Sequence, residues 1–356
     1  MNRIDFAAEL NQEQWTAVQA GDGPVLIIAA AGTGKTRTLV YRVAWLVDKG
    51  VRGENILLLT FTNKAAAEMM QRARERVGAD PLQGMWGGTF HHVANRMLRL
   101  HAEKLGYRSD YTILDSDDQR SLMKTIYEEL GHKGDKEFPK PQVLLSLFSL
   151  AVNKAGDIRE LVIDRFADHH IDVESILAIQ QTYQERKKTL NALDFDDLLS
   201  EAVRLLEEHP GPREYYQHKF RYVMVDEYQD TNPVQSRFVD LLSGGSGNLL
   251  VVGDDFQSIY GWRGADYRNI LDFPEKFPGA QVYKLVTNYR SVPGILQVAN
   301  RCIAGNPEQF QKELRAVRTD GVKPVLARLQ DGRHQARYLI HQFRALRRNG
   351  YAWKDM

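Results

Sequence analysis

The stretch VLIIAAAGTGKT, residues 25–36, decides the fold of this chain. Its apolar first half predicts a buried β-strand. The KTRTLVYRVAWLVDKG segment that overlaps its end has apolar residues on one helical face and closes at Gly50. A buried strand that turns sharply into a helix is the opening unit of an α/β fold with a parallel sheet.

The turn between this strand and helix is a candidate phosphate-binding loop. AAAGTGKT (29–36) fits that pattern except that Ala29 replaces the first glycine. The glycines let backbone N–H groups surround an anion, and the helix N-terminus adds positive dipole character. Lys35 would reach the β- and γ-phosphates of a nucleotide, and Thr36 would place its hydroxyl on Mg²⁺. A glycine-rich turn without a ligand is the simpler alternative, which the lysine–threonine pair disfavours.

Three more strand-like segments end in polar residues: NILLLTFT (55–62), YVMVDEYQD (222–230) and NLLVVGDD (248–255). In a parallel sheet these polar ends share one edge, where ligands bind. Asp226 and Glu227 would supply one carboxylate for Mg²⁺ and one to orient or deprotonate the attacking water. Such a pair is often only a solvated turn, but beside a phosphate loop it indicates an ATPase or GTPase.

The middle of the chain is predicted to be helical. We expect no strand from about Val93 to Glu208, and Ser116 with Gln119 is predicted to form a capping box. Strand–helix alternation then resumes in VYKLVTN and PVLARLQD, read as two further βα units. The predicted domains are a discontinuous first core (1–109 and 191–280), a helical insertion (110–190) and a partial second core (281–356).

The composition is that of a globular protein rather than a membrane or disulfide-rich protein. The 356 residues have 43% apolar and 26% charged residues, which is ordinary for a globular protein. The single cysteine, Cys302, excludes an internal disulfide, and no signal peptide or bilayer-spanning run is evident, so we expect a cytoplasmic protein without a membrane partner. Net charge is +1, yet residues 312–356 hold 11 Lys and Arg against 4 Asp and Glu. That segment could follow a phosphate backbone, but on charge alone a solvated helix face is the favoured interpretation.

Taken together, the motifs resemble those of superfamily 1 DNA helicases of the UvrD/Rep/PcrA group. The similar segments follow the family's order: LNQEQWTAV (10–18), TFTNKAAAEM (60–69), GTFHH (88–92), LDFDDLL (193–199), DEYQD (226–230), VVGDDFQSIYGWRGAD (251–266) and TNYRS (287–291). Alanine at position 29 is usual in this group. The resemblance implies RecA-like P-loop NTPase cores, ATP and Mg²⁺ as cofactors, and single-stranded DNA and its junctions with duplex as partners.

The resemblance also assigns roles around the nucleotide. It places Gln14 on the adenine edge, Tyr289 stacked on the adenine, and Arg290 as an arginine finger on the γ-phosphate. Gln257 lies where a side chain could touch the γ-phosphate. The nucleotide set is completed by Ala31, Gly32, Thr33, Gly34, Lys35, Thr36 and Arg37. One departure is Val286, which stands where the family usually has glutamate, so local packing is expected to differ.

A second set of residues is expected to bind DNA. Tyr260, Trp262 and Arg263 offer two aromatic faces and a guanidinium, and stacking on such faces tolerates any base sequence. Core aromatics are the alternative, disfavoured by the glycines and charges around them. The resemblance adds Phe61, Thr62, Asn63, Thr89, Phe90, His91 and, more loosely, Phe195. We reject a metal role for His91–His92, since ligand partners at suitable spacing are lacking.

These residues leave several functions open. The first is a DNA-stimulated ATPase that moves 3′ to 5′ along one strand and separates duplex. Members of the family continue well beyond this length, so the chain is expected to be a fragment. The second possibility is therefore a module that holds ATP and single-stranded DNA with little unwinding. A helicase–nuclease subunit and a small-molecule kinase are weaker alternatives, and no sequence-specific DNA readout is expected.

Overall fold

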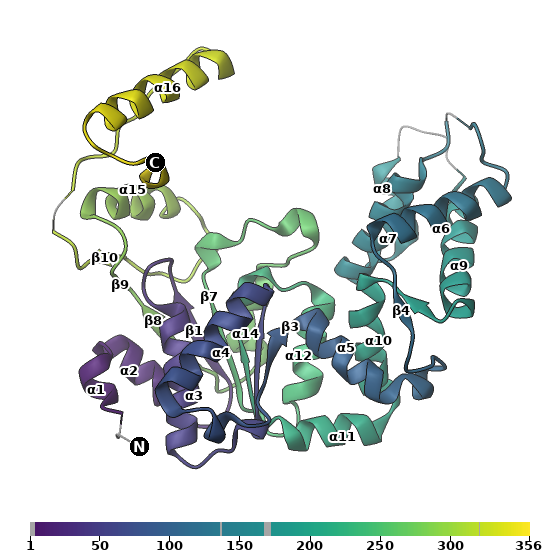
Figure 1. The fold of residues 1–356 in the computed structure, drawn as a ribbon, viewed down its shortest axis with the longest axis horizontal. Helices are drawn as coiled ribbons and strands as arrows, with labels where there is room; N and C mark the ends of the chain where they lie inside the picture. The colour runs from purple at the N-terminus through teal and green to yellow at the C-terminus, as the bar shows by residue number, and fades with distance from the viewer. Residues whose placement is uncertain (1–3, 136, 167–171, 320) are drawn as a thin grey trace.

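The computed structural model describes residues 4–135, 137–166, 172–319 and 321–356. Its centre is a six-stranded, wholly parallel sheet in the order β3-β2-β6-β7-β1-β8 (Figure 1). The strands are β1 (Val25–Ala29), β2 (Ile56–Thr60), β3 (Trp86–Thr89), β6 (Tyr222–Val225), β7 (Leu249–Gly253) and β8 (Gln281–Leu285). The predicted α/β class with a parallel sheet is confirmed.

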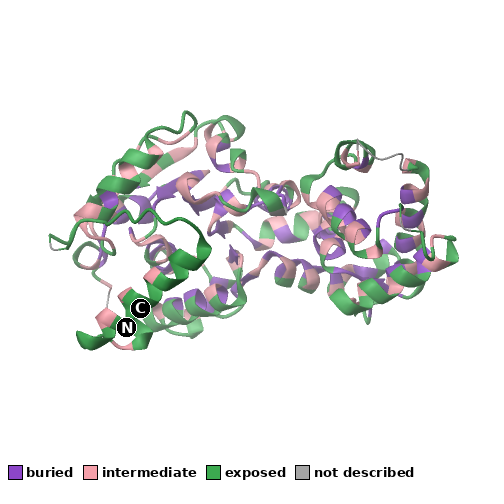
Figure 2. Ribbon diagram, turned by 90° about the horizontal axis from the view of Figure 1, so that it is seen from above, coloured by how far each residue is buried: buried purple, intermediate pink, exposed green. Residues whose placement is uncertain are grey.

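Helices cover both faces of this sheet. Alternate residues of β1 point to opposite faces, so Leu26 joins one hydrophobic cluster and Ile27 the other. The first cluster packs under α5 (Phe90–His101), α10 (Phe195–Glu208), α11 (Pro210–Lys219), α12 (Pro233–Ser243), α13 (Arg268–Leu271) and α14 (Phe273–Lys276). The second packs under α3 (Lys35–Asp48) and α4 (Asn63–Val77), and α1 (Phe6–Glu9) and α2 (Gln12–Val18) lie against α3. Figure 2 shows the strands as the buried layer.

The helical insertion has a hydrophobic core of its own. Its helices are α6 (Ser116–Glu129), α7 (Pro141–Lys154), α8 (Ile158–Arg165) and α9 (Val173–Thr189). At its base two short strands pair, β4 (Thr112–Ile113) with β5 (Ala192–Leu193), where no strand was expected. The predicted capping box is shifted by one residue: Asp115 caps α6 and Asp118 closes the box. Aspartate accepts N–H groups as well as serine does, so either residue suits the cap.

The segment after the sheet differs from expectation in two ways. Strand β8, predicted to open the second core, pairs with β1 and completes the first sheet. Residues 324–331 form no strand, and Val325 and Leu326 are more than four-fifths exposed. A strand needs a neighbour to bond to, and the described residues provide none there. The remaining elements are β9 (Thr287–Asn288), β10 (Arg315–Ala316), α15 (Pro293–Ile303) and α16 (Gly332–Arg348).

Within the described ranges, every helix is too short or too polar to cross a lipid bilayer.

Candidate nucleotide and DNA sites

The carboxyl ends of β1, β6 and β7 surround one cavity of about 710 Å³. Lys35 reaches it from the phosphate loop, Glu227 from β6 and Gln257 from β7. Most residues predicted to hold the nucleotide line it: Gln14, Ala31, Gly32, Gly34, Lys35, Thr36, Arg37, Glu227, Gln257, Tyr289 and Arg290. Glu9, Asn11 and Arg72 also line it and were not anticipated from the sequence.

The phosphate loop has a shape that only glycine allows at two positions. Gly32 and Gly34 have φ angles of 86° and 92°, in the left-handed region. A Cβ at Gly32 would lie 2.6 Å from the Cβ of Arg290, and one at Gly34 would lie 2.5 Å from Gln14 Nε2. The loop is therefore closely covered by residues that were assigned to the nucleotide.

Thr33 does not line the cavity, contrary to its assignment. Its side chain is fully buried and donates a hydrogen bond to the carbonyl oxygen of Ala30 at 2.7 Å. The carbonyl oxygen of Thr33 accepts a hydrogen bond from Gln14 Nε2 at 2.9 Å. Thr33 thus fixes the loop from behind, because a buried hydroxyl is satisfied most easily by a nearby carbonyl.

Lys35 and Glu227 are joined directly. Lys35 Nζ lies 2.5 Å from Glu227 Oε2, and the lysine side chain is only 10% exposed. Gln229 Nε2 donates to the same carboxylate oxygen at 2.9 Å. Glu227 has a φ of 53°, which is uncommon outside glycine and asparagine. This backbone turn directs the carboxylate toward the phosphate loop.

Asp226 lies beside Glu227 in a smaller cavity of about 250 Å³, which it shares with Thr36. Its side chain is 4% exposed, and Oδ1 has no hydrogen-bond partner among the described residues. Burial, and then repulsion by Glu227, raise the pKa of Asp226 to about 7, although Lys35 opposes the shift. A buried, unsatisfied carboxylate oxygen in a cavity that Thr36 also lines fits a hard divalent cation such as Mg²⁺.

The side of the cavity predicted to hold adenine is built from the ends of α1 and α2. Asn11 caps α2 through a capping box with Gln14, which is buried. Asn11 Nδ2 also donates to the Tyr289 hydroxyl at 2.7 Å. Arg37 donates to the carbonyl oxygen of Glu9 at 2.7 Å. Asn11 therefore holds the Tyr289 ring, which is predicted to stack on adenine. The sequence does not reveal this role, because an asparagine at this position is explained by helix capping alone.

The chain that leads to Arg290 is bonded to the phosphate loop. Asn288 Nδ2 donates to the carbonyl oxygen of Ala31 at 2.7 Å, and Tyr289 N donates to that of Gly32 at 2.9 Å. Just upstream, the backbone N–H of Val286 donates to Glu13 Oε2 at 2.9 Å. Glu13 in α2 therefore supplies a carboxylate at Val286, the position where the family usually has glutamate.

A second cavity, of about 650 Å³, lies between the first core and the helical insertion. Five residues predicted to contact DNA line it: Phe61, Thr62, His91, Tyr260 and Trp262. The Trp262 side chain is 68% exposed and Tyr260 is 41% exposed, with ring centroids 6.5 Å apart. The alternative that these two rings are core residues is therefore wrong. Asn153, Asp196 and Asp230 also line the groove and were missed from the sequence.

The other residues predicted to contact DNA differ in how exposed they are. Phe90 is 1% exposed and packs against Phe61 at a centroid distance of 5.4 Å, so its assignment to DNA is wrong. Residue Thr89 caps α5, Asn63 begins α4 on the surface, and Phe195 is 51% exposed with its ring 6.2 Å from that of His91. The side chain of Arg263 lies outside the described part of the chain.

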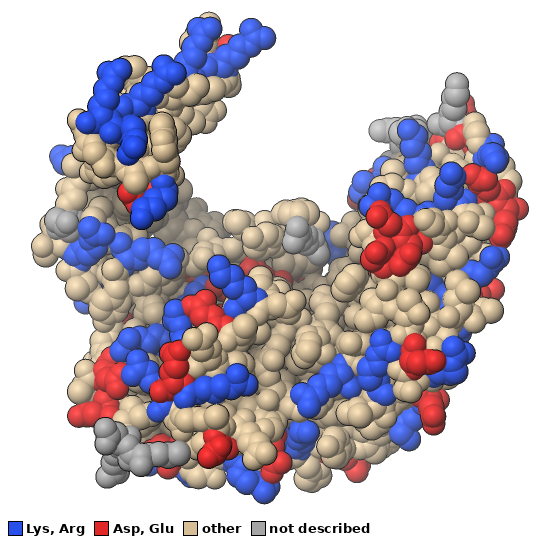
Figure 3. Space-filling model, in the orientation of Figure 1, with Lys and Arg blue, Asp and Glu red and all other residues tan. Residues whose placement is uncertain are grey.

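Basic residues also gather away from the sheet. Figure 3 shows Lys and Arg side chains over α16, at the upper left of the view. This helix carries five arginines and no acidic residue, and none of its residues is buried. The arginines of α16 are thus displayed on an open surface, as both sequence interpretations allow.

Comparison with known proteins places this site in a family. The family model for the UvrD/REP helicase N-terminal domain matches residues 10–278. The chain is 40% identical over 348 residues to the ATP-dependent DNA helicase PcrA of Staphylococcus aureus, covering 98% of this chain and 47% of that protein. The PcrA of Staphylococcus epidermidis is 39% identical with the same coverage. The chain spans about half the length of the curated relatives it matches. The geometry of the phosphate loop and its carboxylates agrees with this match, and the chain belongs to the UvrD/REP helicase family.

Proposed function

We propose that this chain is the ATP- and DNA-binding part of an ATP-dependent DNA helicase, which moves 3′ to 5′ along single-stranded DNA and opens duplex at junctions. The observation that carries the proposal is the path of the chain after β7. Gln257 lines the nucleotide cavity, and five residues later Trp262 lines the groove. A change at the terminal phosphate can thus reach a base-stacking surface through one short segment.

The nucleotide cavity supplies the groups that phosphoryl transfer needs. Lys35 and Arg290, which line the cavity, would offer positive charge to the phosphates, and Glu227 would accept a proton from the attacking water. Lys35 and Glu227 neutralise each other. Phosphate oxygens that draw Lys35 away would free Glu227 to act as the base.

Asp226 and Thr36 are the residues that would hold Mg²⁺. When bound, the cation neutralises charge that develops on the phosphate oxygens. The unsatisfied, buried Oδ1 of Asp226 supports this assignment, as does the cavity that it shares with Thr36. Binding of a cation there requires Asp226 to be ionised.

The groove suits a single strand without regard to its sequence. The exposed rings of Tyr260 and Trp262 give bases a surface for stacking, and Phe61 and His91 line the same groove. The buried Phe90 supports Phe61 from below. The wide mixture of polar side chains around the groove offers contacts to sugar and phosphate.

The second candidate is a binding module that holds ATP and DNA but hydrolyses ATP slowly. Residues 321–331 lie exposed beside α15 rather than in a sheet, so only part of a second wall faces the nucleotide. Catalysis that depends on closing two walls would then be weak in this chain. A cytoplasmic location likewise stays a prediction.

An ATPase assay with and without oligo-dT separates these functions. For a motor, we expect oligo-dT to raise the rate of hydrolysis, and Lys35→Ala to abolish hydrolysis. Unchanged slow turnover, together with retained binding of both ligands, would favour the module. A chain that binds neither ATP nor oligo-dT would contradict both.

A further inference from the structure

A short segment after α15 ties together the two elements that carry Gln257 and Arg290. Residues 310–312 contact the turn after β7, where the backbone N–H of Phe310 donates to Asp255 Oδ2 at 2.8 Å. A few residues later, Arg315–Ala316 form β10, which pairs with β9 just before Tyr289. This segment, residues 310–316, therefore bridges two walls of the nucleotide cavity.

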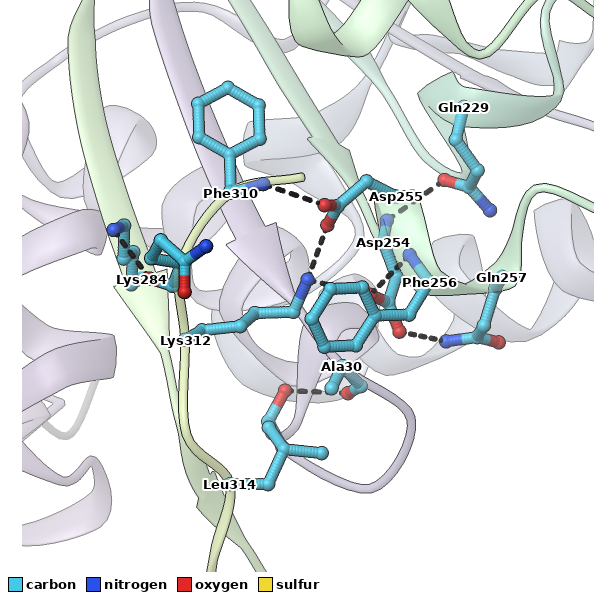
Figure 4. A network of polar contacts seen from close by, with 12 residues as sticks. Ala30, Gln229, Asp254, Asp255, Phe256, Gln257, Lys284, Phe310, Lys312 and Leu314 are labelled. Carbon is cyan, nitrogen blue, oxygen red and sulfur yellow. Dashed lines mark hydrogen bonds and ion pairs between the residues drawn. The ribbon is translucent and has the colours of Figure 1, made fainter. Parts of the chain in front are cut away.

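Lys312 is the anchor of this segment. Its side chain is 0% exposed, and Nζ contacts Asp255 and lies 3.1 Å from Asp254 Oδ1. The same nitrogen lies 3.2 Å from the centroid of the Phe256 ring. Figure 4 shows Lys312 reaching into the turn from the side, with Phe310 above it and both aspartates around its amine.

The contacts continue from Lys312 to the catalytic groups. Asp254 Oδ2 accepts a hydrogen bond from Gln257 Nε2 at 2.6 Å, and Asp254 N donates to Gln229 Oε1 at 3.0 Å. Gln229 in turn donates to Glu227, the partner of Lys35. An amide nitrogen carries two hydrogens, so Gln257 can keep one on Asp254 and offer the other to a phosphate oxygen.

We propose that Lys312 is a positioning residue for the γ-phosphate contact of Gln257. This inference rests on the proposed function. It adds Lys312, which is not among the residues that line the nucleotide cavity. Lys312 neutralises part of the charge of Asp254 and Asp255, which would otherwise stand unpaired near the place of an anionic ligand. It also fixes the Asp254 carboxylate that holds Gln257.

The test is the preference of the chain for ATP over ADP, measured with Mg²⁺ and two fluorescent analogues, a non-hydrolysable ATP analogue and ADP. Only the former has a γ-phosphate for Gln257 to contact. We expect Lys312→Met to weaken binding of the ATP analogue by about 10-fold, the worth of one hydrogen bond to a charged group, with ADP affinity nearly unchanged. Lys312→Arg, which keeps the charge, should restore most of the preference.

The chain contains a matched control in Lys187. Its side chain is 1% exposed, and Nζ lies 2.6 Å from both Asp194 and Asp197. It also faces an aromatic ring, that of Tyr183, at 4.5 Å. Lys187→Met removes an equally buried lysine from two carboxylates at the edge of the helical insertion. It should lower the melting temperature without changing the ATP-to-ADP preference.

A double-variant comparison shows whether Lys312 acts through Gln257. In a Gln257→Ala background, Lys312→Met should weaken binding of the ATP analogue no further. An unchanged preference in folded Lys312→Met, or an additional full loss in the double variant, overturns the proposal. If Lys312→Met does not fold, Lys312→Gln takes its place as the variant without the charge. A folded Lys312→Gln that loses the preference for the ATP analogue supports the proposal, and one that keeps the preference of the unaltered chain overturns it. If the unaltered chain binds neither analogue, the proposed function itself fails and the inference falls with it.

Discussion

Lys35 Nζ lies 2.5 Å from Glu227 Oε2, so the phosphate-loop lysine and the candidate base form an ion pair. This pair predicts that substitution of Lys35 and substitution of Glu227 have different effects on nucleotide binding. Lys35→Ala should abolish nucleotide binding. Glu227→Gln should keep or tighten binding, because it frees Lys35, while hydrolysis falls by about 100- to 10,000-fold. Nucleotide titration and phosphate release measure the two effects, and equal loss of binding in both variants would contradict the assignment.

The buried carboxyl of Asp226 predicts a pH-dependent stability. Its pKa is raised from 3.8 to about 7, chiefly by burial and then by Glu227, against the opposing charge of Lys35. The folded state therefore binds more protons than the unfolded state between these values, and the free energy of unfolding falls as pH rises through this window. Asp226→Asn removes the effect.

Urea denaturation of the nucleotide-free protein tests this. The free energy of unfolding of Asp226→Asn minus that of the unaltered protein should rise by about 2–3 kcal/mol from pH 5 to pH 8. Comparison with the single variant cancels contributions from Asp230 and Asp197, whose pKa values are also raised to about 6, chiefly by burial. A difference that stays constant with pH would show that Asp226 is ionised throughout.

The exposed Trp262 ring predicts a selective loss of DNA binding. Trp262→Ala should weaken binding of oligo-dT by about 5- to 100-fold, since stacking of one base is worth roughly 1–3 kcal/mol. ATP affinity without DNA should not change. Fluorescence anisotropy gives the first quantity and nucleotide titration the second. Trp353, 61% exposed and remote in sequence, provides the control, because Trp353→Ala should leave oligo-dT binding unaltered.

Phe90 should behave as a core residue. Because it is 1% exposed and packs on Phe61, Phe90→Ala should lower the free energy of unfolding by about 3–5 kcal/mol. Phe90→Leu, which keeps most of the volume, should fold and bind oligo-dT nearly as well as the unaltered protein. Strong loss of DNA binding in a stably folded Phe90→Leu would return this residue to the DNA surface.

The parts of the site that are contiguous in the chain could be predicted from sequence. The phosphate loop, the Asp226–Glu227 pair and the Trp262 segment each follow a strand, and parallel strands bring such ends to one edge. Phe90 was misassigned, and the Thr33 side chain points away from the cavity, because a motif gives the position of a residue but not the direction of its side chain.

Other features depend on contacts between distant residues. Whether Gln281–Leu285 joins the first sheet or a second depends on which strand is free to pair with it, and β1 had an open edge. Lys312 and Asp255 are 57 positions apart, and no local pattern links them. Buried ion pairs of this kind carry no periodicity, so only the folded structure reveals them.

The chain leaves the first sheet at Leu285 and is bonded to the phosphate loop at Gly32 before α15 begins. Figure 1 shows α16 far from the sheet, at the end of the segment that follows this contact. A hinge at this contact would then lie beside the predicted site of phosphate cleavage. A small rotation at that hinge would move the far end of α16 through a much larger distance.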